Sequence, residues 1–275
     1  MSRLGRATAL ALTAASLLTW AGAARAQGPV YTATPPTPGA LDRDGQTGRY
    51  LLGGSWLYRP DPTNVGVAQG WWASAPSTDG WSPVTVPNAY NAGDFSSASM
   101  TGSVGWYRRD FTLPSGAFSR YVPTADRHWI IRFESVNYRA SVWLNGHLIG
   151  GHAGAYLPFE FDISPQLHAG VNQLIVRVDD TRGANDLPPG PGGGWWNFGG
   201  ILSEVYLRTA QRADVQQVQV RPILPCPSCA ATIQEQVAVR NVTGVTQHVS
   251  LHGYYGSIPV DFGAAAIRPH ATWSA

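Results

Sequence analysis

Hydrophobic and polar residues alternate one by one over most of the chain. In HWIIRFESV, Trp129, Ile131 and Phe133 fall on one side of an extended strand, and their neighbours fall on the other. The stretches FEFDIS and QLIVRVDD repeat this alternation further along. A period of two, with turn residues between the runs, is typical of antiparallel strands that pack on one side. Since amphipathic helical patterns are missing, the sequence predicts an all-β sandwich.

The alternation falls into two units. The longer unit covers residues 49–210, and a second begins near Ala213. Residues 213–275 hold three further strand-like stretches, DVQQVQVRPIL, ATIQEQVAVRNVT and TQHVSLHGYYG. An immunoglobulin-like sandwich takes roughly 100 residues and seven strands, which is more than this segment provides. We expect either an incomplete immunoglobulin-like β-sandwich or an unusually small domain, and we favour the first.

The N-terminus has the pattern of a secretory signal peptide. Two early arginines precede an apolar run at 7–18, and Ala24-Arg25-Ala26 forms a small-x-small cleavage site before Gln27. The run is too short to cross a membrane comfortably. We therefore expect residues 1–26 to be removed from an exported chain, periplasmic or extracellular, that is not held by the membrane. Residues 27–48 are rich in Pro, Gly and Thr and predict an irregular arm.

The charged residues exclude several kinds of chemistry. All nineteen basic residues are arginine, which rules out Schiff-base catalysis and a P-loop lysine. Without residues 1–26, which carry three arginines and no acid, sixteen basic and seventeen acidic residues leave a formal charge of −1. A nearly neutral chain is poorly suited to phosphate backbones, so we expect no nucleic-acid partner.

The two cysteines, Cys226 and Cys229, stand in PCPSCA between strand-like segments. A redox pair of the thioredoxin type would open a helix, and a zinc site would need two more ligands. We favour a small structural disulfide between them, with free thiols or a metal or redox pair as alternatives. No metal site or cofactor is expected.

Several ordered motifs in the first unit resemble those of one enzyme family. The stretches are LLGGSWLYRPDP (51–62), WSPVTVPNAYN (81–91), GSVGWYRRDFTLP (102–114) and NYRASVWLNGHLIGGHAGAYLPFEFDIS (137–164), followed by NQLIVRVDD and WWNFGGILSEVYLRT. They resemble the N-terminal sugar-binding domain of glycoside hydrolase family 2, closest to its β-glucuronidase and β-galactosidase branches. The resemblance implies a jelly-roll (galactose-binding-like) β-sandwich, followed by an immunoglobulin-like domain. In such members a TIM barrel with two catalytic glutamates comes next, and this sequence holds no such barrel.

The acidic residues do not supply the catalytic pair of that family. Retaining glycoside hydrolysis needs two carboxyl groups about 5–5.5 Å apart. In this family the acid/base follows an asparagine, and the sequence has no Asn-Glu pair. Of its four glutamates, Glu134, Glu160 and Glu235 stand on the polar side of expected strands, where a solvated role is favoured, and Glu204 follows GGILS. We expect no catalytic residue in the chain and no hydrolysis by the chain alone.

Sugar recognition has candidates near residue 180. In family members the loop before the FGGI strand approaches the sugar, and the matching region here is VDDTRGANDLPPG. Aromatic faces and a few polar groups are the usual parts of a sugar site. The candidate substrate-binding residues are Asp179, Asp180, Asn185, Asp186, Trp195 and Trp196. The alternatives are structural turns for the four polar residues and core or interface packing for the tryptophans.

The stretch VWLNGHLIGGH could be mistaken for a metal or catalytic site. Asn145-Gly146 instead indicates a type I′ hairpin, because both positions accept a positive φ. In a regular return strand His147 and His152 would lie on opposite faces, although a bulge at Gly150-Gly151 could realign them. We favour a structural role, since two histidines alone make neither a zinc site nor a triad.

These observations favour one function over two others. The chain is expected to be the non-catalytic, carbohydrate-binding and scaffolding N-terminal part of an exported family 2 glycoside hydrolase whose substrate is a β-glycoside. One alternative is a free-standing carbohydrate-binding module. The other is a structural or adhesion sandwich that binds no sugar.

Overall fold

A computed structural model describes residues 43–44, 49–75, 77–113, 127–168, 170–187 and 195–275. The predicted signal peptide (1–26) lies outside these residues, as does most of the predicted arm. Within the described part, the elements are strands except for helix α1 (Ser97–Thr101) and the 3-10 turn η3 (Ser164–Gln166). The all-β prediction is confirmed. Neither described helix has the length and hydropathy that a membrane crossing requires.

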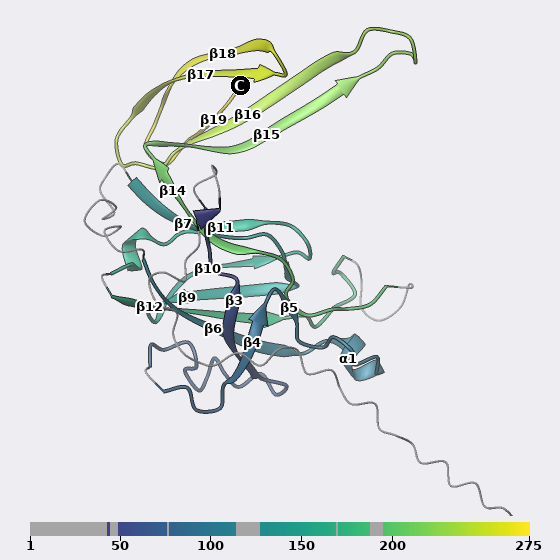
Figure 1. Ribbon diagram of the computed structural model, residues 1–275, viewed down its shortest axis with the longest axis vertical. Coiled ribbons are helices and arrows are strands. Elements are labelled where there is room, and N and C mark those ends of the chain that lie inside the picture. Colours follow the sequence, from purple (N-terminus) through teal and green to yellow (C-terminus); the bar gives the residue numbers. More distant parts are fainter. Residues whose placement is uncertain (1–42, 45–48, 76, 114–126, 169, 188–194) are drawn as a thin grey trace, which may run out of the picture.

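Two antiparallel sheets enclose the core of the first unit (Figure 1). One sheet has the strand order β10-β9-β12-β6-β3-β4. In the facing layer β14 pairs with β2 and β7, β7 pairs with β11, and β2 pairs with β1. The strands are β1 (Arg43–Asp44), β2 (Arg49–Leu51), β3 (Gly54–Pro60), β4 (Ser82–Val86), β6 (Val104–Thr112), β7 (Arg127–Phe133), β9 (Arg139–Leu144), β10 (His147–Ala153), β11 (Phe159–Asp162), β12 (Val171–Asp179) and β14 (Val205–Gln211).

The core between the sheets is filled by the side chains that the alternation places on one side of each strand. Trp129, Ile131 and Phe133 of β7 are fully buried, and they form one cluster with inward residues of β9 and β12. The rings of Phe133 and Phe159 stack with centroids 5.0 Å apart. Full burial of a large apolar side chain contributes about 1.5–3 kcal/mol, so this cluster holds the two sheets together.

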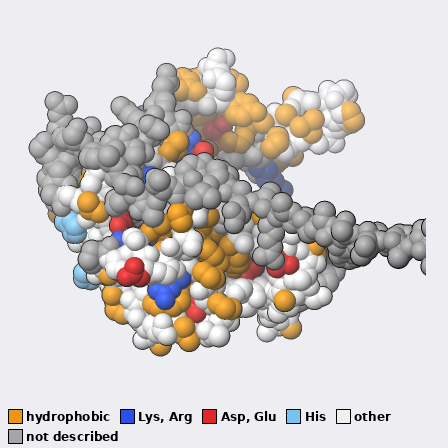
Figure 2. Space-filling model, turned by 60° about the horizontal axis from the view of Figure 1, so that its bottom comes forward, with side chains coloured by type: hydrophobic (Ala, Val, Ile, Leu, Met, Phe, Trp, Pro, Cys, Tyr) orange, Lys and Arg blue, Asp and Glu red, His pale blue; other side chains and the backbone are white. Residues whose placement is uncertain are grey.

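A second apolar cluster lies on the outer side of the six-stranded sheet. Trp106 and Trp143 stack there with centroids 5.4 Å apart, and Trp71 meets Trp106 edge-on at 5.9 Å. The buried carboxylate of Asp61 accepts the Nε1–H of Trp106 at 2.9 Å. Figure 2 brings the bottom of Figure 1 forward and shows hydrophobic side chains gathered near the middle of that face, with acidic and basic ones beside them.

The hairpin between β9 and β10 has the predicted turn. Asn145 and Gly146 have φ values of 51° and 80°, as a type I′ turn requires. A bulge between Leu148 and Gly150 then shifts the register, so that His152 lies opposite Ala140 on the core side of the sheet. The return strand is therefore not regular: a bulge realigns it, as the sequence allowed, but between Leu148 and Gly150 instead of at Gly150-Gly151. The ring of His152 stacks on Phe159 at 4.3 Å.

This burial makes stability depend on pH through His152. Desolvation lowers the pKa of His152 below its ordinary value of 6.5. Because the folded pKa is the lower one, this contribution to stability is fully present above about pH 6.5, the unfolded value, and it is lost as the pH falls from there through the lowered pKa of the folded state. In urea unfolding at a series of pH values, the stability difference between the natural chain and His152→Gln should decrease below pH 6.5. A difference that is constant with pH would contradict this account.

The second unit has two small sheets. The expected three strands are present as β15 (Ala213–Ile223), β16 (Thr232–Asn241) and β17 (Gln247–Tyr255), and the unit also contains β18 (Ile258–Ile267) and β19 (Thr272–Ser274). Strands β15, β16 and β19 form one sheet, and β17 and β18 form the other. The core includes Val237, Val239 and Ile267. Val218 and Val220 are 60% and 48% exposed, because the β15–β16 hairpin projects beyond β17 and β18 (Figure 1).

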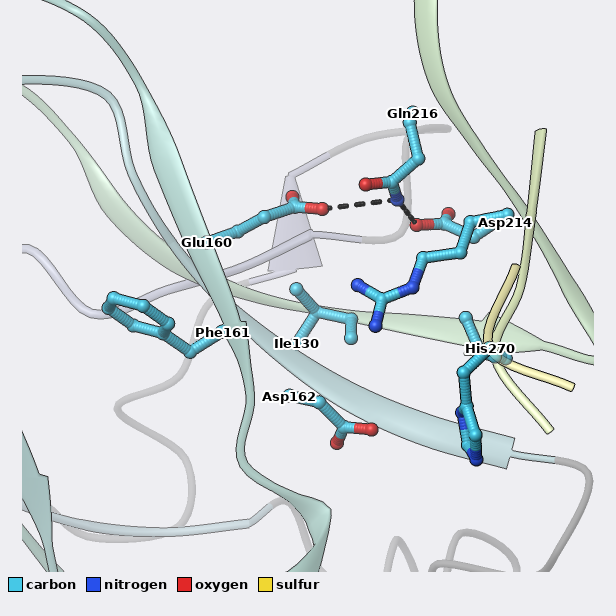
Figure 3. Close-up of a pocket in the computed structure, with 9 residues that line it drawn as sticks. Ile130, Glu160, Phe161, Asp162, Asp214, Gln216 and His270 are labelled. Carbon is cyan, nitrogen blue, oxygen red and sulfur yellow. Dashed lines mark hydrogen bonds between the residues drawn. The ribbon is translucent and has the colours of Figure 1, made fainter. Parts of the chain in front are cut away.

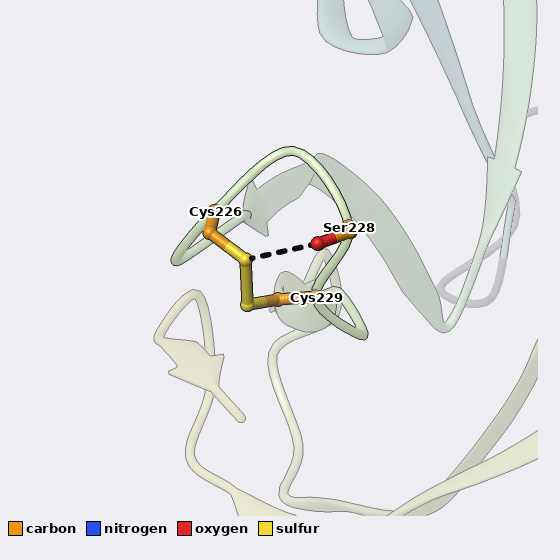
Figure 4. The surroundings of a disulfide bond; sticks show 3 residues. All are labelled: Cys226, Ser228 and Cys229. Atoms are coloured by element: carbon orange, nitrogen blue, oxygen red, sulfur yellow. Dashed lines mark hydrogen bonds between the residues drawn. A yellow bond between two sulfur atoms is a disulfide. The ribbon is translucent and has the colours of Figure 1, made fainter.

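The tip of that hairpin carries the two cysteines. Cys226 and Cys229 are joined by a disulfide in the loop between β15 and β16 (Figure 4). The Cys226 Sγ lies 3.7 Å from the Ser228 hydroxyl oxygen. The loop joins two strands, which is not the helix start that a thioredoxin-type pair would occupy. The bond therefore has the position of a structural clamp on the hairpin.

The two units are joined through Arg208 of β14. Its guanidinium donates to Glu160 of β11 at 2.6 Å and to Asp214 of β15 at 2.6 Å. Beside this pair of contacts, Ile130, Ala210 and Val242 form a small buried cluster that includes both units. The junction thus combines charge-assisted hydrogen bonds with apolar packing.

Candidate functional site

The candidate sugar-contacting residues lie where four segments meet at one end of the first unit. The segments are 88–103, 135–139, 179–187 and 195–201. A small sheet joins three of them through β5 (Asn88–Ala89), β13 (Gly200–Ile201) and β8 (Val136–Asn137). Gly200 at its centre has a φ of 140°, and a Cβ there would lie 2.3 Å from the Asn88 carbonyl oxygen. Only glycine permits this close approach.

Buried amide side chains cross-link these segments. The Nδ2 of Asn197 donates to the Asp180 carbonyl at 2.8 Å, and the Nδ2 of Asn137 donates to the Asn197 Oδ1 at 3.0 Å. Asn91 donates to the Asn197 carbonyl at 2.7 Å. Asn137 and Asn197 are fully buried. These amides set the relative positions of the loops, and sequence reasoning did not identify them.

Asp180 is at the centre of this network and is fully buried. Its Oδ1 accepts the Tyr90 hydroxyl at 2.5 Å and the Ser103 backbone N–H at 2.5 Å. Burial raises the pKa of Asp180, and burial together with Asp180 raises the pKa of Tyr90. A Cβ at Gly199 would lie 2.4 Å from the Asp180 Oδ2. Through its Oδ1, Asp180 therefore links the loops that carry Tyr90 and Ser103.

Asp179 and Asp186 accept hydrogen bonds from their own loop, and Asp186 also accepts from Arg139 at the start of β9. Asp179 accepts from the backbone and hydroxyl of Thr181 at 3.1 and 2.5 Å. Asp186 accepts from the Gly183 N–H and from the guanidinium of Arg139, both at 2.7 Å. The Gly183 N–H, followed by Arg139, lowers the pKa of Asp186. Both carboxylates therefore shape the turn.

Asn185, Trp195 and Trp196 are placed differently from the aspartates. Asn185 is exposed. The Arg182 guanidinium lies 4.9 Å from the Trp195 ring and 4.1 Å from the Tyr138 ring, in cation–π contact with both. Burial lowers the pKa of Arg182. The guanidinium also donates to the Asn137 Oδ1 at 2.5 Å, so it is anchored to the amide network.

The ring of Trp196 does not share the partner of Trp195 but contacts a residue of another segment. Its ring meets Phe95 edge-on with centroids 5.1 Å apart, and Phe95 is 70% exposed. The two adjacent tryptophans thus have different partners, as expected for neighbours in an extended segment. We define the loop-end surface as Phe95, Tyr138, Arg182, Asn185, Trp195 and Trp196.

The structure brings Trp195, Trp196 and Asn185 to this surface and gives Asp179, Asp180 and Asp186 supporting positions. Sequence reasoning missed Phe95, Tyr138 and Arg182. Arg182 stands inside the candidate stretch VDDTRGAND, and Phe95 is a lone aromatic in the polar stretch GDFSS. These two positions in the sequence could have identified Arg182 and Phe95 as candidates, because an aromatic or arginine side chain among polar loop residues often contacts a partner.

The glutamates are engaged elsewhere. Glu134 pairs with Arg132 at 2.8 Å and Glu204 with Arg49 at 3.1 Å, while Glu160 binds Arg208. Glu134 and Glu160 remain partly exposed, as predicted for the polar side of a strand, but each is paired with an arginine. Arg132 lies on the strand that Glu134 follows, and Arg208 comes from the neighbouring strand β14. Likewise, Arg108 binds its neighbour Asp110 at 2.6 Å. Among the described residues, no group of three or more His, Cys, Asp or Glu is arranged to hold a metal ion.

A two-sheet β-sandwich whose loops present aromatic, arginine and amide side chains at one end has the parts that a sugar-binding domain uses. The sequence comparison specifies which one. Residues 50–210 match the family model "Glycosyl hydrolases family 2, sugar binding domain". This match covers more than half of the chain, and the chain belongs to glycosyl hydrolase family 2.

Its relatives include glycosidases from animals and bacteria. The chain is 32% identical to the beta-glucuronidase of Mus musculus over 153 residues, covering 50% of this chain and 22% of that protein. It is 33% identical to the beta-galactosidase of Thermoanaerobacter pseudethanolicus over 117 residues, covering 42% of this chain and 15% of that protein. The chain thus spans about a fifth or less of the length of these relatives.

Solved structures share the fold. The beta-glucuronidase of Ruminococcus gnavus superposes with a TM-score of 0.58 at 20% identity, covering 81% of this chain and 39% of that one. The coverage includes part of the second unit as well as the first, since it exceeds the share of the chain that the family model matches. The all-β sandwich architecture is therefore that of family 2 proteins.

Proposed function

We propose that the chain is the non-catalytic, sugar-contacting part of an exported family 2 β-glycosidase. The observation that carries the proposal is the loop-end surface, in which the Arg182 guanidinium contacts the rings of Tyr138 and Trp195 and Asn185 of the same loop is exposed. The signal-like N-terminus supports export. The names of the relatives, which are beta-glucuronidases and a beta-galactosidase, support a β-glycoside as the substrate class of the parent enzyme.

The side chains of this surface suit a sugar. Aromatic rings cover the apolar faces of a pyranose, while guanidinium and amide N–H groups donate to its hydroxyl oxygens. The amide network beneath them holds the loops in place, so little ordering is required on binding. In a longer enzyme such a surface would form part of the rim of a substrate pocket.

Binding by the chain alone tests this proposal. We expect calorimetric titration with phenyl β-D-galactoside or phenyl β-D-glucuronide to show weak, saturable binding. Arg182→Ala should weaken it roughly tenfold, as expected for the loss of a hydrogen bond from a charged group. The matched control is Arg221→Ala, since Arg221 is exposed on β15 in the other unit, and it should leave binding unchanged.

The results also separate the alternatives. No binding at millimolar sugar would contradict the proposal and favour a structural sandwich. Strong binding by the chain, with no family 2 barrel encoded after residue 275 in the genomic DNA, would favour a free-standing carbohydrate-binding module. The chain alone should not hydrolyse chromogenic β-glycosides, because its sequence holds no Asn-Glu acid/base motif, and measurable turnover would show that a catalytic pair was overlooked.

A further inference from the structure

A cavity of about 100 Å³ lies at the junction of the two units, and none of its lining residues belongs to the loop-end surface (Figure 3). Its walls come from β7 and β11 of the first unit and from β15, β16 and the residues after them in the second. Ile130 and Val242 give it an apolar side, and both belong to the buried junction cluster. The cavity has room for several water molecules.

The acidic side of the cavity is held in place by other residues. Arg208 binds both Glu160 and Asp214. The Gln216 amide lies between the same two carboxylates and donates to each, at 3.3 Å to Glu160 (Figure 3). On the opposite side, the Asp162 carboxylate accepts the Ser164 N–H at 2.9 Å. These contacts orient the carboxylates before any ligand arrives, which favours binding by a preformed site.

The basic side is different. Arg240 and His270 line the cavity, and both side chains are exposed. Within the part of the chain that the structure describes, neither side chain forms a hydrogen bond or an ion pair. His270 has a φ of 56°, in the left-handed region that a few residue types tolerate. The cavity therefore combines three carboxylates that are held in place with two side chains, Arg240 and His270, whose N–H groups are available to a ligand.

This combination selects the chemistry of a ligand. The charges around the cavity are close to balanced, because Arg208 pairs with Glu160 and Asp214 and His128 lies beside Asp162. Arg240 therefore does not make the cavity strongly positive, as a site for a simple anion would be. The described residues offer no cluster with the arrangement of a metal site. A neutral hydroxyl group, in contrast, can donate to a carboxylate and accept from a guanidinium at once. A compact molecule with several hydroxyl groups satisfies both sides of the cavity, and its carbon atoms can contact Ile130 and Val242.

We propose that the junction cavity binds one hydroxyl-rich unit of a carbohydrate, at a site separate from the loop-end surface. The ligand's hydroxyl groups donate to Asp162 and Glu160 and accept from Arg240 and His270. Because the site is built from both units, an occupied cavity favours their observed relative placement. The site is independent of the proposed sugar contact at the loop end.

The test is a titration of the ¹⁵N-labelled full chain with D-xylose and, separately, D-galactose, followed by NMR. We expect saturable shifts at the amides of Glu160, Asp214, Gln216 and Arg240. Arg240→Ala should weaken this binding roughly tenfold, the loss of one charge-assisted hydrogen bond. His270→Asn, which keeps a residue suited to positive φ, should weaken it in the same direction.

Arg221→Ala is the matched control, because it removes an exposed arginine from β15 without touching the cavity, and it should bind as the natural chain does. The absence of saturable shifts at the junction amides with both sugars would overturn the proposal. Equal losses in Arg240→Ala and Arg221→Ala would also overturn it. Shifts confined to the indole signals of Trp195 and Trp196 would report the loop-end surface instead, so that failure of one site is distinguishable from failure of the other.

Discussion

Replacing Phe133 by alanine is expected to lower the free energy of unfolding by about 3–5 kcal/mol. Phe133 is fully buried between the two sheets and stacks on Phe159 at 5.0 Å. Strand β7, on which it lies, pairs with both β11 and β14. The surrounding strands are therefore held by other pairings and cannot collapse into the space that the ring vacates. A cavity in a core that cannot relax gives a loss at the upper end of this range.

The measurement is urea unfolding followed by tryptophan fluorescence, with Phe95→Ala as the matched control. Phe95 is 70% exposed, so its truncation should change stability by no more than about 0.5 kcal/mol. The substitution should nevertheless weaken sugar binding, because Phe95 belongs to the loop-end surface and its ring contacts Trp196 there. Equal destabilisation by the two substitutions would contradict the assignment of core and surface.

The second large effect is expected for Asn197→Ala, which should lower stability by about 2–4 kcal/mol because several buried polar groups lose their partner. The Asn197 side chain donates to the carbonyls of Asp180 and Met100, at 2.8 and 3.4 Å, and accepts from Asn137 at 3.0 Å. No water can replace these contacts without opening the loops, since Asn197 is fully buried. Sugar binding should fall with stability, because the loops 179–187 and 195–201 lose their common anchor.

Asn185→Ala is the control for that prediction. It removes the same chemical group from an exposed position in the neighbouring loop, so stability should stay within about 0.5 kcal/mol of the natural chain. The comparison, again by urea unfolding, separates the positioning amide from a surface amide. A loss of binding in Asn185→Ala without a loss of stability would place Asn185 in contact with the sugar. Unchanged stability in Asn197→Ala would contradict the supporting role of the network.

The strands and the core could be predicted from the sequence because both follow from the pattern of neighbouring residues along the chain. The alternation of Trp129, Ile131 and Phe133 depends only on the period of an extended chain, and these residues are the buried ones. Asn145-Gly146 likewise carries its turn type in two adjacent residues. The bulge between Leu148 and Gly150 was not placed correctly, because nothing in a strand's own pattern specifies where its register shifts against a partner.

The candidate site was predicted less well because its contacts join distant parts of the chain. Asp180 is an acid in a loop, and its sequence alone does not show that Tyr90 and Ser103 enclose it. The same reason explains the glutamates. Glu160 lies on the polar side of β11 as expected, but Arg208 from β14 forms an ion pair with it. Tertiary partners, rather than local pattern, decide whether a polar residue is solvated, buried or free to bind.

The central claim is that the chain contacts carbohydrate through the loop-end surface. The most direct measurement is NMR of the chain with ¹⁵N-labelled tryptophan during titration with a phenyl β-D-glycoside, using the indole signals as site-specific reporters. The account predicts saturable shifts of the indole signals of Trp195 and Trp196, assigned with single Trp→Phe variants, and unchanged signals from the fully buried Trp106 and Trp129. Saturable binding that leaves Trp195 and Trp196 unshifted, or no binding at millimolar glycoside, would contradict it.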